Sequence, residues 1–283
     1  MQLTDPLVSA GRALLLGAAI SLAGAALAQG YEGSPCAVDE EGAQALNPKA
    51  LAHKASALRV VLDADYPGLY TYNATSFLAA GPFKVAPPPA PEDPSMADPE
   101  LLWEWEAARD AHSCRYGPGQ ASDADPKTAW CEGVEGHGVG ESLVVGAWSA
   151  LKPGTQVEIF AGFGKSPKLH KANARPKEVV LRLFRVKEVG AAQVVMWGEG
   201  LTLLGEATHT LRDHFGPQRL PLPAQAPSCE GEEESCALVL SVTIKSVYPG
   251  RRYKDTCISE LGFFDPPEAA EKKKGAGTEG AKK

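Results

Sequence analysis

The chain has 283 residues, with 28 lysines and arginines against 35 aspartates and glutamates, so its net charge is −7 at neutral pH. That acidic balance argues against a protein that binds duplex nucleic acid, which normally presents a basic face. The 23 prolines and 29 glycines are many for a helical protein and favour a β-rich chain with many turns.

Residues 1–28 have the pattern of a secretory signal peptide. Arg12 precedes an apolar stretch at 13–27, and Ala-Leu-Ala at 26–28 supplies a cleavage site of small residues. The apolar stretch is shorter than the ~20 residues of a typical membrane span, although an uncleaved anchor is the alternative. We therefore expect cleavage near Ala28 and a secreted or periplasmic protein that does not span a membrane.

The next block, residues 29–86, predicts a short helix at 47–57 and a strand at 58–62. Its role as a small N-terminal appendage or as an extra layer is left open by the sequence. Residues 87–99 form a Pro-rich linker, which cannot continue a helix or a central strand. A helix is predicted at 99–109, with Asp98 as its cap and Pro99 in its first turn.

The remaining pattern, at 100–267, predicts a β-sandwich or barrel. Residues 238–244 alternate with a period of two and have one fully apolar face, formed by Leu238, Leu240, Val242 and Ile244. Further short β-rich runs at 142–148, 156–160, 179–186 and 193–197 are separated by turn residues, as in sandwiches and barrels. Residues 268–283 contain no large apolar side chain and predict a disordered tail.

Six cysteines in an exported chain favour three disulfides over a reactive thiol. Cys229 and Cys236 flank a short acidic loop and are expected to close it. No CxxC pair is present, which argues against a zinc site.

The common catalytic motifs are missing, so we expect no enzyme. The sequence has neither HExxH nor GxSxG, and Gly-His-Gly-Val-Gly at 136–140 lacks the Lys-Ser/Thr of a phosphate-binding loop. Glu132, Glu135 and Glu141 surround that loop as possible paired carboxylates of a glycosidase. Solvated loop acids are the alternative.

The most informative segment is Ala-Ser-Asp-Ala-Asp-Pro-Lys-Thr-Ala-Trp at 121–130. Asp123, Asp125 and Thr128 supply the hard oxygen ligands that calcium prefers. Asp-x-Asp turns also commonly cap their own backbone, which is the alternative. Trp130 directly after the turn is expected to begin a buried strand.

This segment resembles the Asp-Gly-Asp-x-x-Thr-x-Trp turn of discoidin-like domains, the coagulation factor five/eight type C family. The motifs that follow resemble the branch named for the translocation domain of secreted NAD glycohydrolases; they lie at 129–133, 136–141, 162–166, 173–177, 248–250 and 255–260. The likeness covers about residues 105–265.

The resemblance implies a mainly β fold, a galactose-binding-like jelly-roll β-sandwich whose end loops bind a ligand, often a glycan. It implies a structural calcium ion held by Asp123, Asp125, Thr128 and Glu260, with Ala124 in place of the usual glycine. It further implies the disulfide Cys131–Cys257, with Cys229–Cys236 and Cys36–Cys114 as the other two. The last would attach the N-terminal block to the sandwich.

The loops of that implied fold carry side chains suited to sugar recognition, which needs planar hydrogen-bonding groups and an aromatic surface. The candidate ligand-binding residues are Tyr116, Glu132, His137, Glu141, Lys165, His170 and Asp255. The alternative for Glu132, Glu141 and Asp255 is that they satisfy backbone amides of the long loops.

We therefore expect an exported, non-enzymatic module that binds a glycan or another cell-envelope component. The runner-up is a structural or accessory protein that docks a partner protein through the N-terminal block. A third interpretation, part of an NAD glycohydrolase-type toxin system, follows only from the name of the family.

Overall fold

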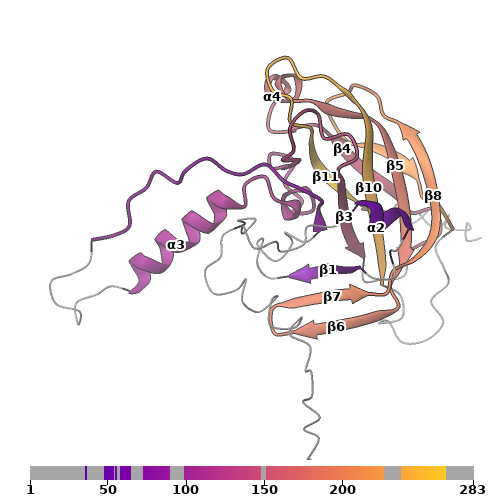
Figure 1. Ribbon diagram of the computed structural model, residues 1–283, viewed down its shortest axis with the longest axis horizontal. Helices are drawn as coiled ribbons and strands as arrows, with labels where there is room; N and C mark the ends of the chain where they lie inside the picture. The colour runs from indigo at the N-terminus through magenta and orange to yellow at the C-terminus, as the bar shows by residue number, and fades with distance from the viewer. Residues whose placement is uncertain are drawn as a thin grey trace, which may run out of the picture.

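Two antiparallel four-stranded sheets form the body of the protein (Figure 1). The computed structural model describes residue 36 and residues 48–53, 55, 58–64, 73–89, 99–147, 151–225 and 237–265. The first sheet has the order β3 (Ser142–Ala147), β10 (Leu238–Tyr248), β5 (Arg175–Arg185) and β8 (Thr202–Thr210). The second has the order β2 (Trp130–Cys131), β11 (Cys257–Phe264), β4 (Gln156–Ala161) and β9 (Gln218–Pro221).

The core lies between these two sheets. The apolar face predicted for β10 is buried there, and Leu240 and Val242 are fully enclosed. Ile159 of β4 and Ile258 of β11 meet them from the second sheet in the same apolar cluster. Each such side chain contributes roughly 1.5–3 kcal/mol on burial. The mainly β sandwich expected from the sequence is confirmed.

The described residues 48–64 of the N-terminal block belong to a third layer of the fold. Strand β1 (Arg59–Ala64) pairs with β7 (Val195–Glu199), which pairs with β6 (Glu188–Ala192) in a small three-stranded sheet. Leu62 of β1 and Leu51 of α2 (Pro48–His53) pack against Phe184 on the outer face of the first sheet. The question left open by the sequence is answered in favour of an extra layer.

Residues 73–78 enter the main core instead of linking two domains. Ala74 and Phe77 are buried in the central cluster, and the indole Nε1 of Trp130 donates to the carbonyl of Ser76 at 2.8 Å. The amide of Leu78 donates to the carbonyl of Cys131 at 2.8 Å. Residues 73–78 thus pack against the first sheet and strand β2, although they precede the sandwich in the chain.

The sandwich is fastened by two disulfides, both among the implied pairs. Cys131 and Cys257 lie opposite each other in the antiparallel pair of β2 and β11 and are bonded. Cys36 is bonded to Cys114, which ties the N-terminal block to the sandwich. The third implied pair, Cys229–Cys236, lies outside the described residues, as do Trp148, the leader 1–28 and the tail 268–283.

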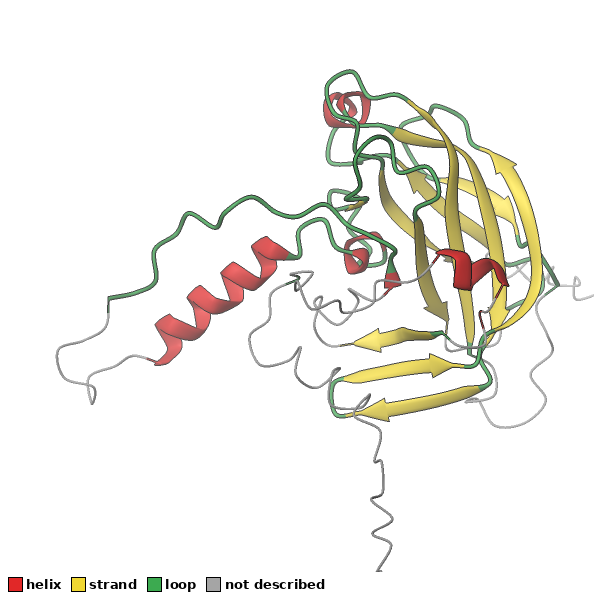
Figure 2. Cartoon of the chain, viewed as in Figure 1, coloured by secondary structure: helices red, strands yellow, loops and turns green. Residues whose placement is uncertain are grey.

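The helices are short except for α3 (Pro99–Ser113), which begins where predicted and continues four residues further. Helix α3 and the extended segment 79–89 project together from the sandwich, and we call them the arm (Figure 2). Phe83 contacts the rings of Trp105 and His112, and Trp105 Nε1 donates to the carbonyl of Val85 at 2.9 Å. No residue of α3 is buried.

Candidate ligand-binding end of the sandwich

Three loops meet at the end of the sandwich that carries α4 (Pro167–Ala172), opposite the three-stranded sheet (Figure 1). Ser166 caps the helix, and its hydroxyl accepts a hydrogen bond from the amide of Leu169 at 3.2 Å. A side-chain oxygen at this position satisfies a donor that the first turn leaves unpaired. The loops at 133–140 and 249–255 lie beside this helix and complete the end of the sandwich.

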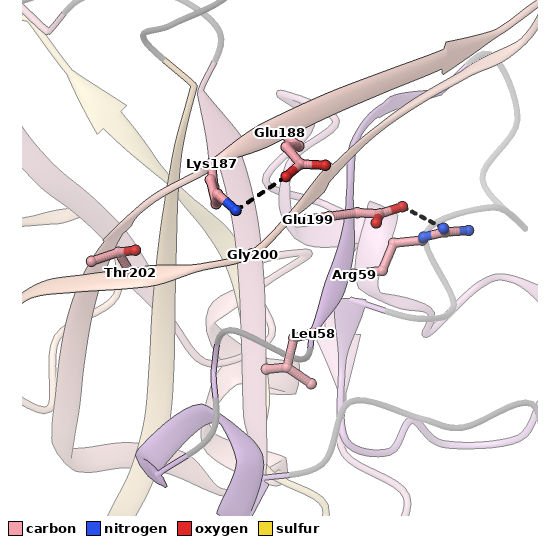
Figure 3. Close-up of a pocket in the computed structure, with 7 residues that line it drawn as sticks. All are labelled: Leu58, Arg59, Lys187, Glu188, Glu199, Gly200 and Thr202. Atoms are coloured by element: carbon pink, nitrogen blue, oxygen red, sulfur yellow. Dashed lines mark ion pairs between the residues drawn. The ribbon is translucent and has the colours of Figure 1, made fainter.

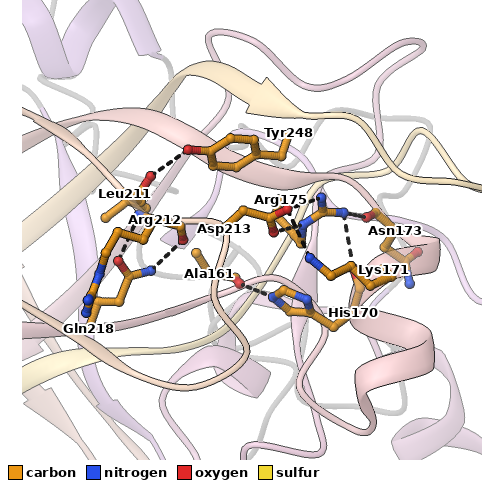
Figure 4. Close-up of polar contacts among 10 residues, drawn as sticks. All are labelled: Ala161, His170, Lys171, Asn173, Arg175, Leu211, Arg212, Asp213, Gln218 and Tyr248. Atoms are coloured by element: carbon orange, nitrogen blue, oxygen red, sulfur yellow. Dashed lines mark hydrogen bonds and ion pairs between the residues drawn. The ribbon is translucent and has the colours of Figure 1, made fainter.

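His170 of α4 faces into the protein (Figure 4). Its Nε2 contacts the carbonyl of Ala161 at 3.1 Å, its Nδ1 has no described partner, and the residue is 1% exposed. Burial lowers the pKa of His170, so the imidazole is neutral at pH 7. Gly162 has a φ of +107°, and a Cβ there would lie 2.6 Å from the imidazole. The side chain is therefore enclosed by the fold and is not exposed to a ligand.

Arg175 fastens α4 to the neighbouring loop (Figure 4). It donates to the carbonyl of Asn173 at 2.8 Å and to both carboxylate oxygens of Asp213, with Nε at 2.8 Å. Although burial opposes the shift, hydrogen bonds from Arg175 and Lys171 lower the pKa of Asp213. Sequence reasoning missed this pair, because 38 residues separate the partners and neither belongs to a recognisable motif.

The loop at 133–140 is anchored from below by Glu132. This carboxylate is fully buried and accepts hydrogen bonds from the amides of Thr256 at 3.0 Å and Val134 at 2.9 Å. Burial raises the pKa of Glu132, against the lowering effect of those two amides. His137 Nδ1 also contacts the carbonyl of Lys254 at 3.0 Å. Loops 133–140 and 254–256 thus form one continuous surface.

Some of the other predicted ligand-binding residues form contacts within the protein, and others lie at the surface. Glu141 accepts hydrogen bonds from the hydroxyls of Thr75 and Ser76, and Tyr116 packs edge-on against Phe163 beside the Cys131–Cys257 bond. Asp255 is half-buried, and Lys165 is exposed. Glu132 and Glu141 therefore follow the alternative given for them, because both accept hydrogen bonds from the protein itself. Lys165 and His137 are placed where a ligand can reach them.

The Asp-x-Asp turn caps itself. Asp123 accepts hydrogen bonds from the hydroxyl of Thr128 at 2.8 Å and from the amide of Asp125 at 2.9 Å, while Asp125 accepts from the amide of Lys127. Ala124 has a φ of +61°, in the left-handed region that favours glycine.

Glu260 lies near this turn, on β11. Its Oε1 is buried without a described hydrogen-bond partner. Burial, followed by the charges of Asp123, Asp125 and Glu158, raises the pKa of Glu260 to about 7. Glu260 also lines a pocket of about 570 Å³ with Ala124, Pro126, Glu158 and Phe160 among its neighbours.

The fit of this group to a calcium ion is incomplete. Hard oxygen donors and one orphaned carboxylate oxygen are what a cation would use. Within the described ranges, however, no three His, Cys, Asp or Glu side chains lie close enough together to hold a metal ion. The hydroxyl of Thr128 is directed to Asp123 and to the carbonyl of Asp125.

The turn that leads into Trp130 and the strand pair β2–β11 both lie in the part of the chain that matches a known family. A family model for the NAD glycohydrolase translocation F5/8 type C domain matches residues 106–264, more than half of the chain. The chain belongs to this family. Searches of the curated proteins and of the solved structures returned no match.

The part shared with the translocation F5/8 type C family contains the whole end of the sandwich just described. It excludes α2, β1 and the first seven residues of α3, which the match does not reach. The disulfides Cys36–Cys114 and Cys131–Cys257 indicate an extracytoplasmic location for the protein. None of the helices in the described part of the chain has the length and apolar character needed to cross a membrane.

A second pocket, of about 410 Å³, lies at the opposite end of this F5/8 domain, against the three-stranded sheet (Figure 3). Arg59 forms an ion pair with Glu199, and Lys187 forms one with Glu188 at 3.3 Å. Because each cation is paired with an anion, this pocket presents no excess charge to a ligand. None of the candidate ligand-binding or metal-binding residues predicted from the sequence lines this pocket.

Proposed function

We propose that this protein is an exported, non-enzymatic binding module that recognises a glycan of the cell envelope through the α4 end of the sandwich. The observation that supports the proposal is that backbone hydrogen bonds and buried side chains hold three loops in place. The side chains of these loops that point outward remain exposed. Glu132 holds two backbone amides from beneath, while Lys165 and Lys168 face outward. A surface fixed in this way loses little conformational entropy on binding.

A glycan array probed with the full-length protein tests this function. We expect Lys165→Ala and His137→Ala each to weaken binding by about tenfold, which corresponds to ~1.4 kcal/mol. The melting temperature should be unchanged for Lys165→Ala, whereas His137→Ala also loses the contact with the carbonyl of Lys254. Lys187→Ala, at the opposite end, is the matched control and should bind as the wild type does. Absence of binding to every glycan by a correctly folded sample would contradict the proposal.

The non-enzymatic part of the proposal is supported by the use of the loop carboxylates. Glu132 and Glu141 accept hydrogen bonds from the protein itself, and Asp213 is shared by two cations. Incubation of the protein with NAD should release no nicotinamide. Release above that of a heat-denatured sample would establish a glycohydrolase instead.

We further propose that Asp123, Asp125, Thr128 and Glu260 bind a calcium ion, and that the carboxylates, which do not converge in the structure described, move together when it binds. The support is the buried Oε1 of Glu260, which has no described partner, beside two carboxylates that raise its pKa. A bound cation would stabilise the ionised form of Glu260.

A second function, docking of a partner protein, is favoured by the arm. Leu101, Leu102 and Trp103 are neighbours on α3 and are 53%, 46% and 67% exposed. Apolar residues gathered on a surface commonly mark an interaction site. Full-length wild type and Trp103→Glu would be used to retain proteins from an envelope extract. A protein retained by the wild type and lost from the variant favours docking; identical retention argues against it.

A further inference from the structure

The α4 end of the sandwich carries an excess of positive charge in a protein whose net charge is −7. Five exposed basic side chains gather on α4, on the residue before its cap and on the loop between β10 and β11, and we call them the basic surface: Lys165, Lys168, Arg251, Arg252 and Lys254. None of the five forms an ion pair with a described carboxylate; the described ion pairs use other cations.

The two segments that carry these side chains are fixed to one another. The amide of Arg251 donates to the carbonyl of Lys171 at 3.0 Å, and the amides of Arg252 and Tyr253 donate to the carbonyl of Ala172 at 3.0 and 2.9 Å. Gly250 sits so close that a Cβ there would lie 2.5 Å from the carbonyl oxygen of Ala172. The backbone therefore fixes the spacing of the two segments that carry the positive charges before any ligand binds.

The carboxylates of this end do not cancel the charge. Asp213 is already shared by Lys171 at 3.0 Å and Arg175 at 2.8 Å (Figure 4). Asp255 is half-buried, and Glu135 is exposed on the neighbouring loop. Asp123 and Asp125 are also exposed, on the turn that approaches Gly164 beside Lys165. Glu132 lies beneath the surface with its charge directed to backbone amides. Basic side chains thus outnumber exposed acidic ones, and the surface attracts anions.

We infer that the basic surface binds an anionic polysaccharide, one that carries a carboxylate or sulfate group on successive sugars. This inference rests on the proposed function and narrows its ligand class. Charges on separate segments match a chain of repeated anions better than a single anion. Tyr253 is 38% exposed, with the guanidinium of Arg252 5.0 Å from its ring centroid, so an aromatic face for a sugar adjoins a cation.

Binding of the full-length protein to four immobilised probes tests the inference: alginate, dextran sulfate, neutral dextran, and vesicles of phosphatidylglycerol with phosphatidylcholine. We expect alginate and dextran sulfate to bind and neutral dextran not to bind. Affinity should fall steeply as sodium chloride rises from ~0.05 M to ~0.5 M, since salt screens exposed charges.

Two double variants with the same change in net charge locate the site. Lys168→Glu with Lys254→Glu should weaken binding to alginate by more than about tenfold. Lys84→Glu with Lys187→Glu, on the arm and at the opposite end, should keep the affinity within about twofold. Lys165→Gln with Lys168→Gln, which adds no negative charge, provides a milder second variant.

Each other outcome overturns the inference in a distinguishable way. Equal loss from both double variants would mean that net charge, not this surface, drives binding. Binding of neutral glycans that salt and charge reversal leave unchanged would preserve the proposed function and remove the anionic ligand. Binding to the vesicles alone would make the surface a membrane contact. Failure to bind any glycan would remove the proposed function as well.

Discussion

At the scale of single residues, Glu260 has the most consequential environment, because its carboxyl is half-buried beside three other acids. Its pKa is raised to about 7 from an ordinary value of 4.5, so the folded protein holds this proton more tightly than the unfolded chain does. The stability linked to the proton is present below pH 4.5 and is lost as the pH rises towards 7.

Glu260→Gln removes the ionisation and should therefore stabilise the protein at about pH 8 and have little effect at about pH 5. Because the side chain is only partly buried, we expect a gain of about 1 kcal/mol after allowance for solvent screening. Chemical denaturation at the two pH values measures this difference. A variant that is less stable than the wild type at the higher pH would show that the ionised carboxylate is already compensated.

The same variant tests the calcium ligands. Calcium chloride should raise the melting temperature of the wild type at about pH 8 and leave that of Glu260→Gln unchanged, because a bound ion stabilises the folded state by mass action. Magnesium chloride at the same concentration controls for ionic strength. An equal increase in both proteins would place any calcium ion elsewhere.

Some residue roles could be predicted from the sequence and others could not. The family resemblance that the motif around Trp130 carries implied the pairing of Cys131 with Cys257, and the structure contains that bond. His170 was nominated for a ligand and is instead enclosed, since nothing in a six-residue helix marks which side faces inward. Arg251 and Arg252 were not nominated, because their closeness to α4 arises only in the folded chain.

At the scale of elements, β10 could be predicted because every second residue from Leu238 to Ile244 is apolar, although the strand is buried on both faces over residues 238–242. Strand β8, at the edge of the same sheet, is half-exposed and mixes Thr, Leu and Gly without a clear period, so it was not predicted. Helix α4 is too short to show a helical repeat. Elements were thus predictable where apolar residues recur at a regular period over several residues.

The contact between the N-terminal segment and β2 makes an element-scale prediction. A Cβ on Gly133 would lie 2.2 Å from the carbonyl oxygen of Phe77, so Gly133→Ala should separate the two segments. We expect a loss of about 1–3 kcal/mol, measured as a lower urea midpoint.

Gly262→Ala is the matched control, because nothing lies within 4 Å of a Cβ built there. Its stability should change little. Equal behaviour of the two variants would show that residues 73–78 are not closely packed against the loop after β2.

At the scale of the whole molecule, charge is distributed unevenly. The α4 end is basic, whereas Glu100, Glu104 and Glu106 accompany the exposed apolar residues of the arm. The net charge of −7 therefore describes neither surface. The acidic composition that argues against nucleic-acid binding is an average over the whole chain. That average conceals a local excess of positive charge at the α4 end.

The burial of Ala74 and Phe77 has a consequence for how the protein is divided. A fragment cut at the limits of the family match, residues 106–264, would lack both side chains and strand β1 as well. It would expose the apolar flank of β3 to water and leave one half-cystine at position 114 without its bridge. A fragment that keeps the sandwich core intact must consequently be longer than the segment matched by the family model, and it must begin before the arm.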